Sequence, residues 1–381
     1  MPVIHWQNYV SSFFEAAPLI AQSKISLIFL DKLIINLFRA CHLLVLRENF
    51  DRSKIYLRTS VFIDEAQRAG IKFFALAGPL GYINYFFMEK GGRKYLIEGL
   101  PTAEHLSDKS ARLSDKIFVK KCLKKAHLPT AEGESFSLFD QNKAFKYAKK
   151  LGFPLVVKPR FGSMSQHISI NIKSDSELKK AVKRALRYSS YFIVERYLVG
   201  TDVYRATVVD EKFVGCVKRV PAHIRGDGIH TIWELVDLKN QDPRRGLPRA
   251  KDATIFCLVI DETTHRLLGE RGYDLSSVPA KNELVFLQEK VILDLGADLF
   301  EVTKSVHPDN LELFKKTARL FGVKLVGIDF LAEDIAKSWG KQTAAIIELN
   351  NLPYIDMHHF PTEGEPVPIA KYLCDMVIKY Y

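Results

Sequence analysis

Two polar side chains that could hold a metal ion lie two residues apart near the end of the sequence. Glu348 and Asn350 follow the apolar run 344–347 and precede Pro353, which predicts a strand that stops at the proline. Alternate residues of a strand share one face, about 7 Å apart, so the carboxylate and the amide would stand side by side. Oxygen donors so placed suit Mg²⁺. For this stretch alone, a strand end with a polar turn is an equal alternative.

A third oxygen donor, Asp329, lies in the apolar segment 324–330, which we expect to form a buried strand. The polar loop 333–342 separates this strand from the one that carries Glu348 and Asn350. An antiparallel hairpin would bring the three side chains together. The sequence therefore predicts a metal site formed by Asp329, Glu348 and Asn350.

Two lysines lie where secondary-structure elements are expected to begin or end. Lys116 follows Ser114, a plausible N-cap, at the start of a helix that ends near His127. Lys158 ends the apolar run 154–159, which predicts a buried strand, and the loop 161–167 follows. Lysines at such positions can neutralise phosphate groups. No GxxxxGK[ST] motif and no GxGxxG motif occurs, so neither a P-loop nor a Rossmann dinucleotide site is indicated.

Composition limits the class of protein. The chain has 381 residues, of which 47% are hydrophobic and 26% charged, typical of a globular protein with two or three domains. The formal net charge is +11, but the lysines, for example Lys120 and Lys121, read as solvated helix faces and no nucleic-acid-binding motif is present. We therefore expect anionic small molecules rather than nucleic acid. Five scattered cysteines and the lack of a signal peptide favour the cytoplasm.

The N-terminal third predicts an α/β unit without an evident chemical role. Residues 24–47 are the most apolar segment, yet polar residues such as Asp31 and Arg39 interrupt it, so it falls short of a membrane span. We expect an amphipathic helix that packs on the core or on a second subunit, so a homo-oligomer stays open, and membrane-surface docking is the alternative. Residues 54–62, 63–70 and 71–78 predict strand, helix and strand.

The rest of the chain alternates strands and helices. We expect helices at 140–150, 175–187 and 311–321, the last capped by Asp309 or Asn310 and ended by Gly322. A strand is expected at 191–198, followed by a hairpin over 204–220 that turns at Asp210 and Glu211. Trp233 is expected in the core, and His358 and His359 are expected on a strand, on the side of the substrate or in a structural role. His223 and His230 are expected to be hydrogen-bonding loop residues. The fold class is α/β (α+β).

The order of these segments resembles the ATP-grasp superfamily, in particular the ATP-grasp module of cyanophycin synthetases and that of bifunctional glutathione synthetases. The resemblance covers about residues 110–381. The segments that carry it are VVKP (156–159), VERYLVGTD (194–202), RVPAHIRGDGIHTIWELVD (219–237), VTKSVHPDN (302–310), GIDF (327–330) and IIELNNLPYIDMHHFPTEG (346–364). It implies an N-terminal α/β domain, 1–110, and two ATP-grasp subdomains, 111–198 and 199–381.

The resemblance implies a role for each candidate residue. The residues implied to bind ATP are Lys116 and Lys158 at the phosphates, Glu195, Arg196 and Leu198 at the adenine, and Asp202 at the ribose. Arg205 and Arg219 are implied to anchor a phosphate or carboxylate and, with Lys158, to serve in catalysis. Asp329, Glu348 and Asn350 are implied to bind Mg²⁺, with Mn²⁺ as a substitute. Residues 225–230 are implied to form a loop over the active site.

The implied activity is ATP-dependent ligation of a small-molecule carboxylate to an amine, such as an amino acid or a peptide, through an acyl-phosphate. An ATP-grasp kinase without an amine step and a degenerate nucleotide-binding regulatory protein are the alternatives. Two segments depart from the family pattern: the loop FGSMSQHI is poor in glycine, and ILDLGADLFE replaces a Ser/Gly-rich run. With no room for a Mur-ligase-like second domain, the chain is not expected to be a complete cyanophycin synthetase.

Overall fold

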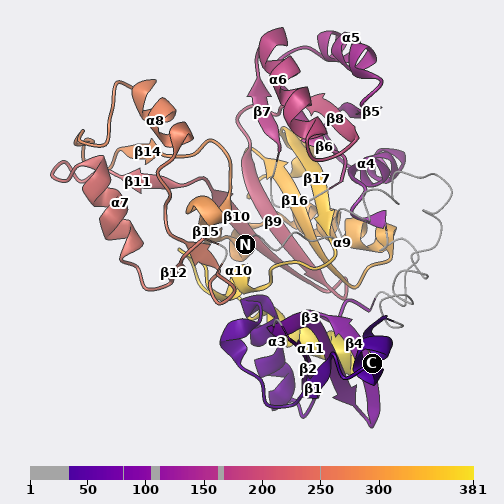
Figure 1. Cartoon of the computed structure of the whole chain (residues 1–381). Helices are drawn as coiled ribbons and strands as arrows, with labels where there is room; N and C mark the ends of the chain where they lie inside the picture. The colour runs from indigo at the N-terminus through magenta and orange to yellow at the C-terminus, as the bar shows by residue number, and fades with distance from the viewer. Residues whose placement is uncertain (1–33, 80, 104–111, 162–166, 249) are drawn as a thin grey trace.

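The computed structural model of the chain describes residues 34–79, 81–103, 112–161, 167–248 and 250–381. Residues 24–33 of the predicted amphipathic helix and most of the predicted loop 161–167 lie outside the described residues. Three further units surround a central sheet (Figure 1). The elements that carry Lys116 and Lys158, helix α4 (Lys116–Lys125) and strand β6 (Leu155–Pro159), lie next to that sheet.

The N-terminal unit is built on a four-stranded antiparallel sheet in the order β1-β2-β3-β4. Its strands are β1 (Val45–Arg47), β2 (Lys72–Gly78), β3 (Gly81–Lys90) and β4 (Arg93–Glu98). Helix α3 (Leu57–Arg68) buries Phe62 against Phe73 of β2. Helix α11 (Ile369–Tyr380), from the far end of the chain, packs into the same apolar core through Leu373. The last helix therefore fastens the N-terminal unit to the remainder of the molecule.

A second antiparallel sheet has the order β5-β8-β6-β7. Its strands are β5 (Gly133–Ser137), β6 (Leu155–Pro159), β7 (Ser169–Ile172) and β8 (Tyr191–Arg196). Helices α5 (Gln141–Leu151) and α6 (Asp175–Leu186) share an apolar core with Val157 of β6 and Val194 of β8. Because side chains alternate along a strand, Lys158 and Glu195 point away from these helices. Helix α4 (Lys116–Lys125) contacts the central sheet at its last strand.

The central sheet has the order β15-β10-β9-β16-β17. Its strands are β9 (Asp202–Val209), β10 (Phe213–Val220), β15 (Asp298–Glu301), β16 (Leu325–Ala332) and β17 (Ala344–Asn350). Helix α9 (Pro308–Phe321) covers one face, where Phe314 meets Phe330 edge-on. Asp210 and Glu211, both at positive φ, form the tight β9–β10 turn where the sequence places it. The other face of the sheet carries the polar residues of the site.

An inserted unit between β10 and β15 extends from the edge of the central sheet (Figure 1). Its elements are β11 (His223–Arg225), α7 (Ile232–Asn240), β12 (Arg245–Gly246), β13 (Ile255–Phe256), α8 (Glu262–Gly269) and β14 (Leu284–Phe286). Strand β11 pairs with β14, and a separate apolar core, including Ile224 and Leu268, supports both. The insert therefore has a hydrophobic core of its own.

Several local predictions are wrong. Most of the strand expected at 54–62 belongs to α3 instead. The helix expected over 24–47 does not reach residue 47, because Val45–Arg47 form β1, which pairs with β2. Asp115 rather than Ser114 caps α4, and His307 rather than Asp309 or Asn310 caps α9.

The predictions for one tryptophan and two histidines are also wrong. Trp233 is 58% exposed because it lies on the outer side of α7. His358 and His359 lie in the short helix α10 (Asp356–His359), not on a strand.

The α/β fold class is confirmed, whereas the domain boundaries stay a prediction. In the described part of the chain, no helix combines the length and the apolar character that crossing a bilayer requires.

Candidate active site

Three neighbouring strands of the central sheet bring the predicted metal ligands together. Asp329 on β16 lies directly opposite Glu348 on β17 and directly opposite Arg205 on β9. Residues at facing positions in neighbouring strands project from the same face of a sheet. The alternating neighbours Tyr204 and Phe330 face the core under α9. The antiparallel hairpin expected from the sequence is therefore confirmed, and it aligns Asp329 with Glu348.

Asp329 is held by two arginines. Its Oδ1 and Oδ2 atoms accept hydrogen bonds from Nε and Nη2 of Arg205, at 2.6 and 3.1 Å, in a buried bidentate salt bridge. Nη2 of Arg219 lies 3.3 Å from Oδ1. Burial alone would raise the pKa of Asp329, but the charges of Arg205 and Arg219 outweigh it and hold that pKa below its ordinary value. The carboxylate is thus held in its ionised form, buried between two guanidinium groups.

Asn350 completes this group with its amide. In the orientation that satisfies its neighbours, the amide nitrogen donates to Oε1 of Glu348 at 3.3 Å, and the amide oxygen accepts from Nη2 of Arg205 at 3.2 Å. Nε of Arg219 is buried and has no hydrogen-bond partner among the described residues. An unsatisfied buried donor of this kind favours an anionic group close to Arg219.

A lysine cluster lies on the second sheet, on the face away from its helices. Glu195 of β8 is buried, with Nζ of Lys158 2.5 Å from Oε1 and Nζ of Lys120 3.0 Å from Oε2. Burial alone would raise the pKa of Glu195, but these two lysines outweigh it and keep the pKa low. A Cβ atom at Gly133 would lie 2.4 Å from Cβ of Glu195, so the close approach of β5 requires glycine there.

Lys116 connects the two groups. The pKa of Lys116 is lowered, mainly because its ammonium group is buried. The negative charge of Glu348 raises this pKa and the positive charge of Lys158 lowers it further, so the ammonium group interacts electrostatically with both residues. Its position is fixed by Asp115, which accepts from the backbone N–H groups of Ile117 and Phe118 and binds Arg160 with both oxygens, at 2.9 and 2.7 Å. Lys116 is therefore held at the start of α4 by a cap and an ion pair.

The remaining residues implied to bind the nucleotide are dispersed. Arg196 is exposed and lies 3.5 Å from Glu132, and the carbonyl of Leu198 accepts from Thr201. Asp202 bonds to Lys218 at 2.5 Å, and strand alternation puts it on the α9 side of β9, opposite to Arg205. Glu195 joins the lysine cluster, whereas Arg196, Leu198 and Asp202 form no ion pair or hydrogen bond with it in the part of the chain that the structure describes.

The three oxygen-bearing residues fit a divalent cation in their chemistry. Two carboxylates and one amide on adjacent strands provide the hard donors that Mg²⁺ prefers, and one acceptor, Glu348, is not in an ion pair within the described residues. The described residues contain no group of three or more histidine, cysteine or acidic side chains arranged to hold a metal. An ion bound here would compete with Arg205 for Asp329.

Sequence reasoning missed three residues that support the site. The sequence predicts a solvated Lys120, yet its side chain is only 11% exposed. Lys120 follows Lys116 by four positions, and this spacing could have indicated that the two lysines share one face of the helix. Arg58 of α3 donates to the carbonyl of Leu352 at 2.8 Å and lies over the ring of Tyr354. His358 is buried between Glu301 and Thr207, at 2.9 Å from each. No local pattern in the sequence indicates these last two contacts.

His223 and His230 form hydrogen bonds, as expected, but His223 lies in strand β11 and not in a loop. Nδ1 of His223 lies 2.9 Å from the carbonyl of Pro221, and Nδ1 of His230 lies 2.6 Å from Oδ2 of Asp227. Asp227 also accepts from the backbone N–H groups of Ile229 and His230, which closes a tight turn within the predicted 225–230 loop. The role of this loop over the active site stays a prediction.

Comparisons with known proteins identify the family to which the chain belongs. Residues 115–245 match the model of the family described as carbamoyl-phosphate synthase L chain, ATP binding domain. Cyanophycin synthetase from Trichormus variabilis is 32% identical over 325 residues, which is 84% of this chain and 34% of the relative. The glutathione biosynthesis bifunctional protein GshAB of Streptococcus agalactiae is 31% identical over 258 residues, 66% of this chain and 34% of that protein. The chain thus spans about a third of the length of these curated relatives.

A solved structure shows the same fold. The bifunctional glutathione synthetase from Pasteurella multocida superimposes with a TM-score of 0.64 at 24% identity, covering 86% of this chain and 44% of that one. Together, the family match, the two groups of relatives and the shared fold confirm the resemblance drawn from the sequence motifs. The chain belongs to the ATP-grasp superfamily and is related in sequence to cyanophycin synthetases and bifunctional glutathione synthetases.

Proposed function

We propose that this chain is an ATP-dependent carboxylate–amine ligase that acts on an amino acid or a peptide. The observation that carries the proposal is the pairing of two charged groups of residues. The lysines around Glu195 and the oxygen donors around Asp329 come from different sheets, and Lys116 lies within electrostatic reach of both. The lysines can neutralise the negative charge of the phosphates, and the oxygen donors can bind the cation that accompanies them. The relatives are named as a cyanophycin synthetase and a glutathione biosynthesis protein, and both names support a synthetic activity.

The proposed reaction has two steps. A carboxylate oxygen of the acid attacks the γ-phosphorus of ATP, the bond to the β–γ bridging oxygen breaks, and ADP leaves. The amine nitrogen then attacks the acyl carbon of the acyl-phosphate, the carbon–oxygen bond breaks, phosphate leaves, and the nitrogen gives up a proton. An amide, ADP and phosphate result. No covalent attachment to the protein is required.

The chain's own residues are proposed to supply position and charge. Lys116 and Lys158 neutralise the phosphates, and Arg219, with its unsatisfied buried Nε, holds the carboxylate or the transferred phosphoryl group. Arg205 orients Asp329 through the bidentate salt bridge. Asp329, Glu348 and Asn350 hold Mg²⁺, which supplies further neutralisation of the phosphate oxygens when bound. We propose that Mn²⁺ can take its place.

Glu348→Gln tests this proposal. The variant keeps the size of the side chain and removes the charge, so ADP release should fall by a factor of about 100 or more if this charge stabilises the transfer. The matched control is Glu333→Gln, an exposed acid at the end of the same hairpin, which should retain full activity. Unchanged ADP release by the Glu348→Gln variant would refute the assignment of Glu348 as a metal ligand. ADP release without amine, with a stable phosphorylated product, would favour the kinase alternative.

Two broader assignments complete the proposal. The chain is proposed to act in the cytoplasm because none of its five cysteines is in a disulfide. It is also proposed to form a homo-oligomer, because residues 34–45, which pack against the N-terminal sheet, expose five apolar side chains; they are Ile34, Leu37, Phe38, Leu43 and Val45. Sedimentation or light scattering of the purified chain would test the second assignment, and a monomer at all concentrations would refute it.

A further inference from the structure

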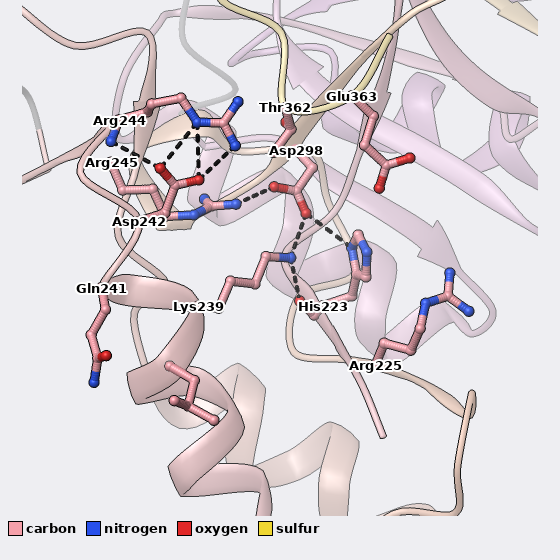
Figure 2. Close-up of a pocket in the computed structure, with 11 residues that line it drawn as sticks. His223, Arg225, Lys239, Gln241, Asp242, Arg244, Arg245, Asp298, Thr362 and Glu363 are labelled. Carbon is pink, nitrogen blue, oxygen red and sulfur yellow. Dashed lines mark hydrogen bonds and ion pairs between the residues drawn. The ribbon is translucent and has the colours of Figure 1, made fainter. Parts of the chain in front are cut away.

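A polar cavity of about 540 Å³ lies in the inserted unit, away from the residues of the proposed ligase site. Its walls come from β11, from the end of α7 and the turn that follows, from the start of β15, and from the segment at Thr362 and Glu363 (Figure 2). Cavities of this size hold small molecules up to about the size of a drug. Of the lining residues only Leu238 is apolar and none has a phenyl or indole ring, so the cavity is polar and mostly charged.

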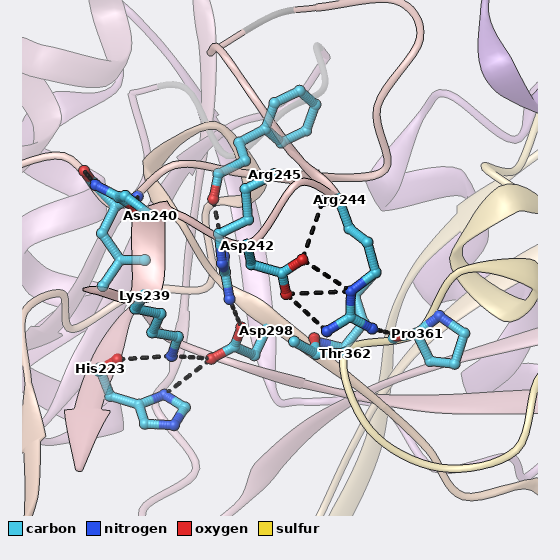
Figure 3. Close-up of polar contacts among 12 residues, drawn as sticks. His223, Lys239, Asn240, Asp242, Arg244, Arg245, Asp298, Pro361 and Thr362 are labelled. Atoms are coloured by element: carbon cyan, nitrogen blue, oxygen red, sulfur yellow. Dashed lines mark hydrogen bonds and ion pairs between the residues drawn. The ribbon is translucent and has the colours of Figure 1, made fainter. Parts of the chain in front are cut away.

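The floor of the cavity carries an excess of positive charge. Asp298 is 1% exposed and binds Arg245, Nζ of Lys239 at 2.5 Å and, more loosely, Nδ1 of His223 at 3.5 Å (Figure 3). Burial and the charge of Lys239 lower the pKa of His223, which is therefore neutral at pH 7. Two cations then face one carboxylate, and Nε of Arg245 is buried without a hydrogen-bond partner among the described residues. Such an excess favours an anionic group in the cavity.

The rim presents one cation and one acid whose charges are not paired within the described residues. Arg225 is exposed, and its Nη1 donates a long hydrogen bond to the carbonyl of Asn282 at 3.4 Å. Glu363 is exposed on the same side of the cavity, and both side chains point toward the space between them (Figure 2). Arg244, by contrast, is neutralised by Asp242 through bonds of 2.7–3.1 Å. The cavity therefore offers a guanidinium group and a carboxylate for a ligand that bears both charges.

The cavity does not include the oxygen donors around Asp329 or the lysines around Glu195, although Arg225 at its rim begins the segment 225–230 that is predicted to cover the active site. Asp298 is opposite Val220 in the β10–β15 register, and Arg219 is opposite Leu299. Adjacent strand residues project from opposite faces, so a ligand in the cavity and a ligand on Arg219 occupy different sides of the sheet.

We propose that this cavity binds a small zwitterion, namely a free amino acid or a short peptide, through its carboxylate and its ammonium group. The carboxylate lies against Arg225 and the positive floor, and the ammonium group lies against Glu363. The proposal does not rest on the ligase activity, because binding is measured without ATP.

The test is calorimetric titration of the full-length purified chain with glutamate, lysine and glycylglycine, and with acetate and inorganic phosphate as probes. Arg225→Gln should weaken binding of the zwitterions by about 10- to 100-fold, as loss of a charge-assisted hydrogen bond predicts. Glu363→Gln should weaken the zwitterions and leave acetate unchanged. The matched control is Arg271→Gln, an exposed arginine of the same unit that also bonds one carbonyl, that of Leu284 at 3.2 Å. It should bind like the unaltered chain.

Glu348→Gln separates the two sites and should leave these titrations unchanged. The proposal is overturned if none of the zwitterions shows saturable binding. It is equally overturned if Arg225→Gln and Glu363→Gln bind them as the unaltered chain does, or if Glu348→Gln abolishes the binding. Phosphate that binds more tightly than every zwitterion would assign the cavity to simple anions instead.

Discussion

Neutralising Asp329 should destabilise the protein far more than neutralising an acid on its surface. In Asp329→Asn, the buried guanidinium groups of Arg205 and Arg219 would lose the carboxylate that lies 2.6 and 3.3 Å away. Leaving one member of a buried ion pair without its partner costs about 3–5 kcal/mol. Since whole domains are stable by only about 5–15 kcal/mol, the loss would be a large share of the total.

The assay is urea denaturation of the unaltered chain and the variant, followed by circular dichroism and tryptophan fluorescence. Asp64→Asn is the control, because Asp64 is 55% exposed and lies 3.6 Å from Arg52, so its change should cost less than about 1 kcal/mol. The contribution of Asp329 also depends on pH. The pKa of Asp329 is depressed in the folded chain. Its stabilisation is therefore complete above the unfolded pKa, about 4, and is lost as the pH falls through the lower folded value.

The variant should lack this acid-dependent loss. The reasoning fails if Asp329→Asn and Asp64→Asn lower the free energy of unfolding by the same amount at pH 7. It also fails if both the variant and the unaltered chain lose the same stability below pH 4.

Three further predictions concern the residues around the site. Lys158→Met should abolish detectable ATP binding in calorimetry, since it removes the buried charge that we propose neutralises the phosphates, and retained affinity would contradict that role. Arg58→Ala should weaken the apparent affinity for Mg²⁺ in an ADP-release assay more than it reduces the maximal rate, because the hydrogen bond from Arg58 to Leu352 holds the segment after β17 in place. An unchanged affinity would refute this prediction. His359, whose Nε2 accepts from the backbone N–H of Ala370, has its pKa lowered to about 4 by burial and by His358. Stability should therefore fall by about 2–3 kcal/mol from pH 6.5 to 4, and His359→Gln should flatten that part of the profile measured by urea titration; the same slope in both proteins would contradict the assignment.

The parts of the site that are close in sequence could be predicted. Asp329 and Glu348 lie on two apolar segments joined by one short polar loop, and a hairpin is the simplest way to pair such segments. The period-2 alternation then fixes which residues share a face. The same local reasoning placed the β9–β10 turn at Asp210 and Glu211, where both residues have positive φ.

The parts that depend on distant contacts could not be predicted. Arg58 and Leu352 are 294 positions apart, and His358 and Thr207 are 151 positions apart. Hydrophobic patterning shows that α11 has an apolar face but not that this face packs against the N-terminal sheet. Lys120 shows the same limit, because only the position of Glu195 on another element makes its burial favourable.

The most direct measurement of the central claim is a product screen with the purified chain. ATP, Mg²⁺ and an acid carrying a heavy-oxygen label in its carboxylate are incubated with and without a panel of amino acids and short peptides, and all products are identified by mass spectrometry. The ligase account predicts amine-dependent ADP release, one amide product, and labelled oxygen in the released phosphate. Amide formation without label in the phosphate, or no ADP release with any acid and amine despite ATP binding, would contradict it.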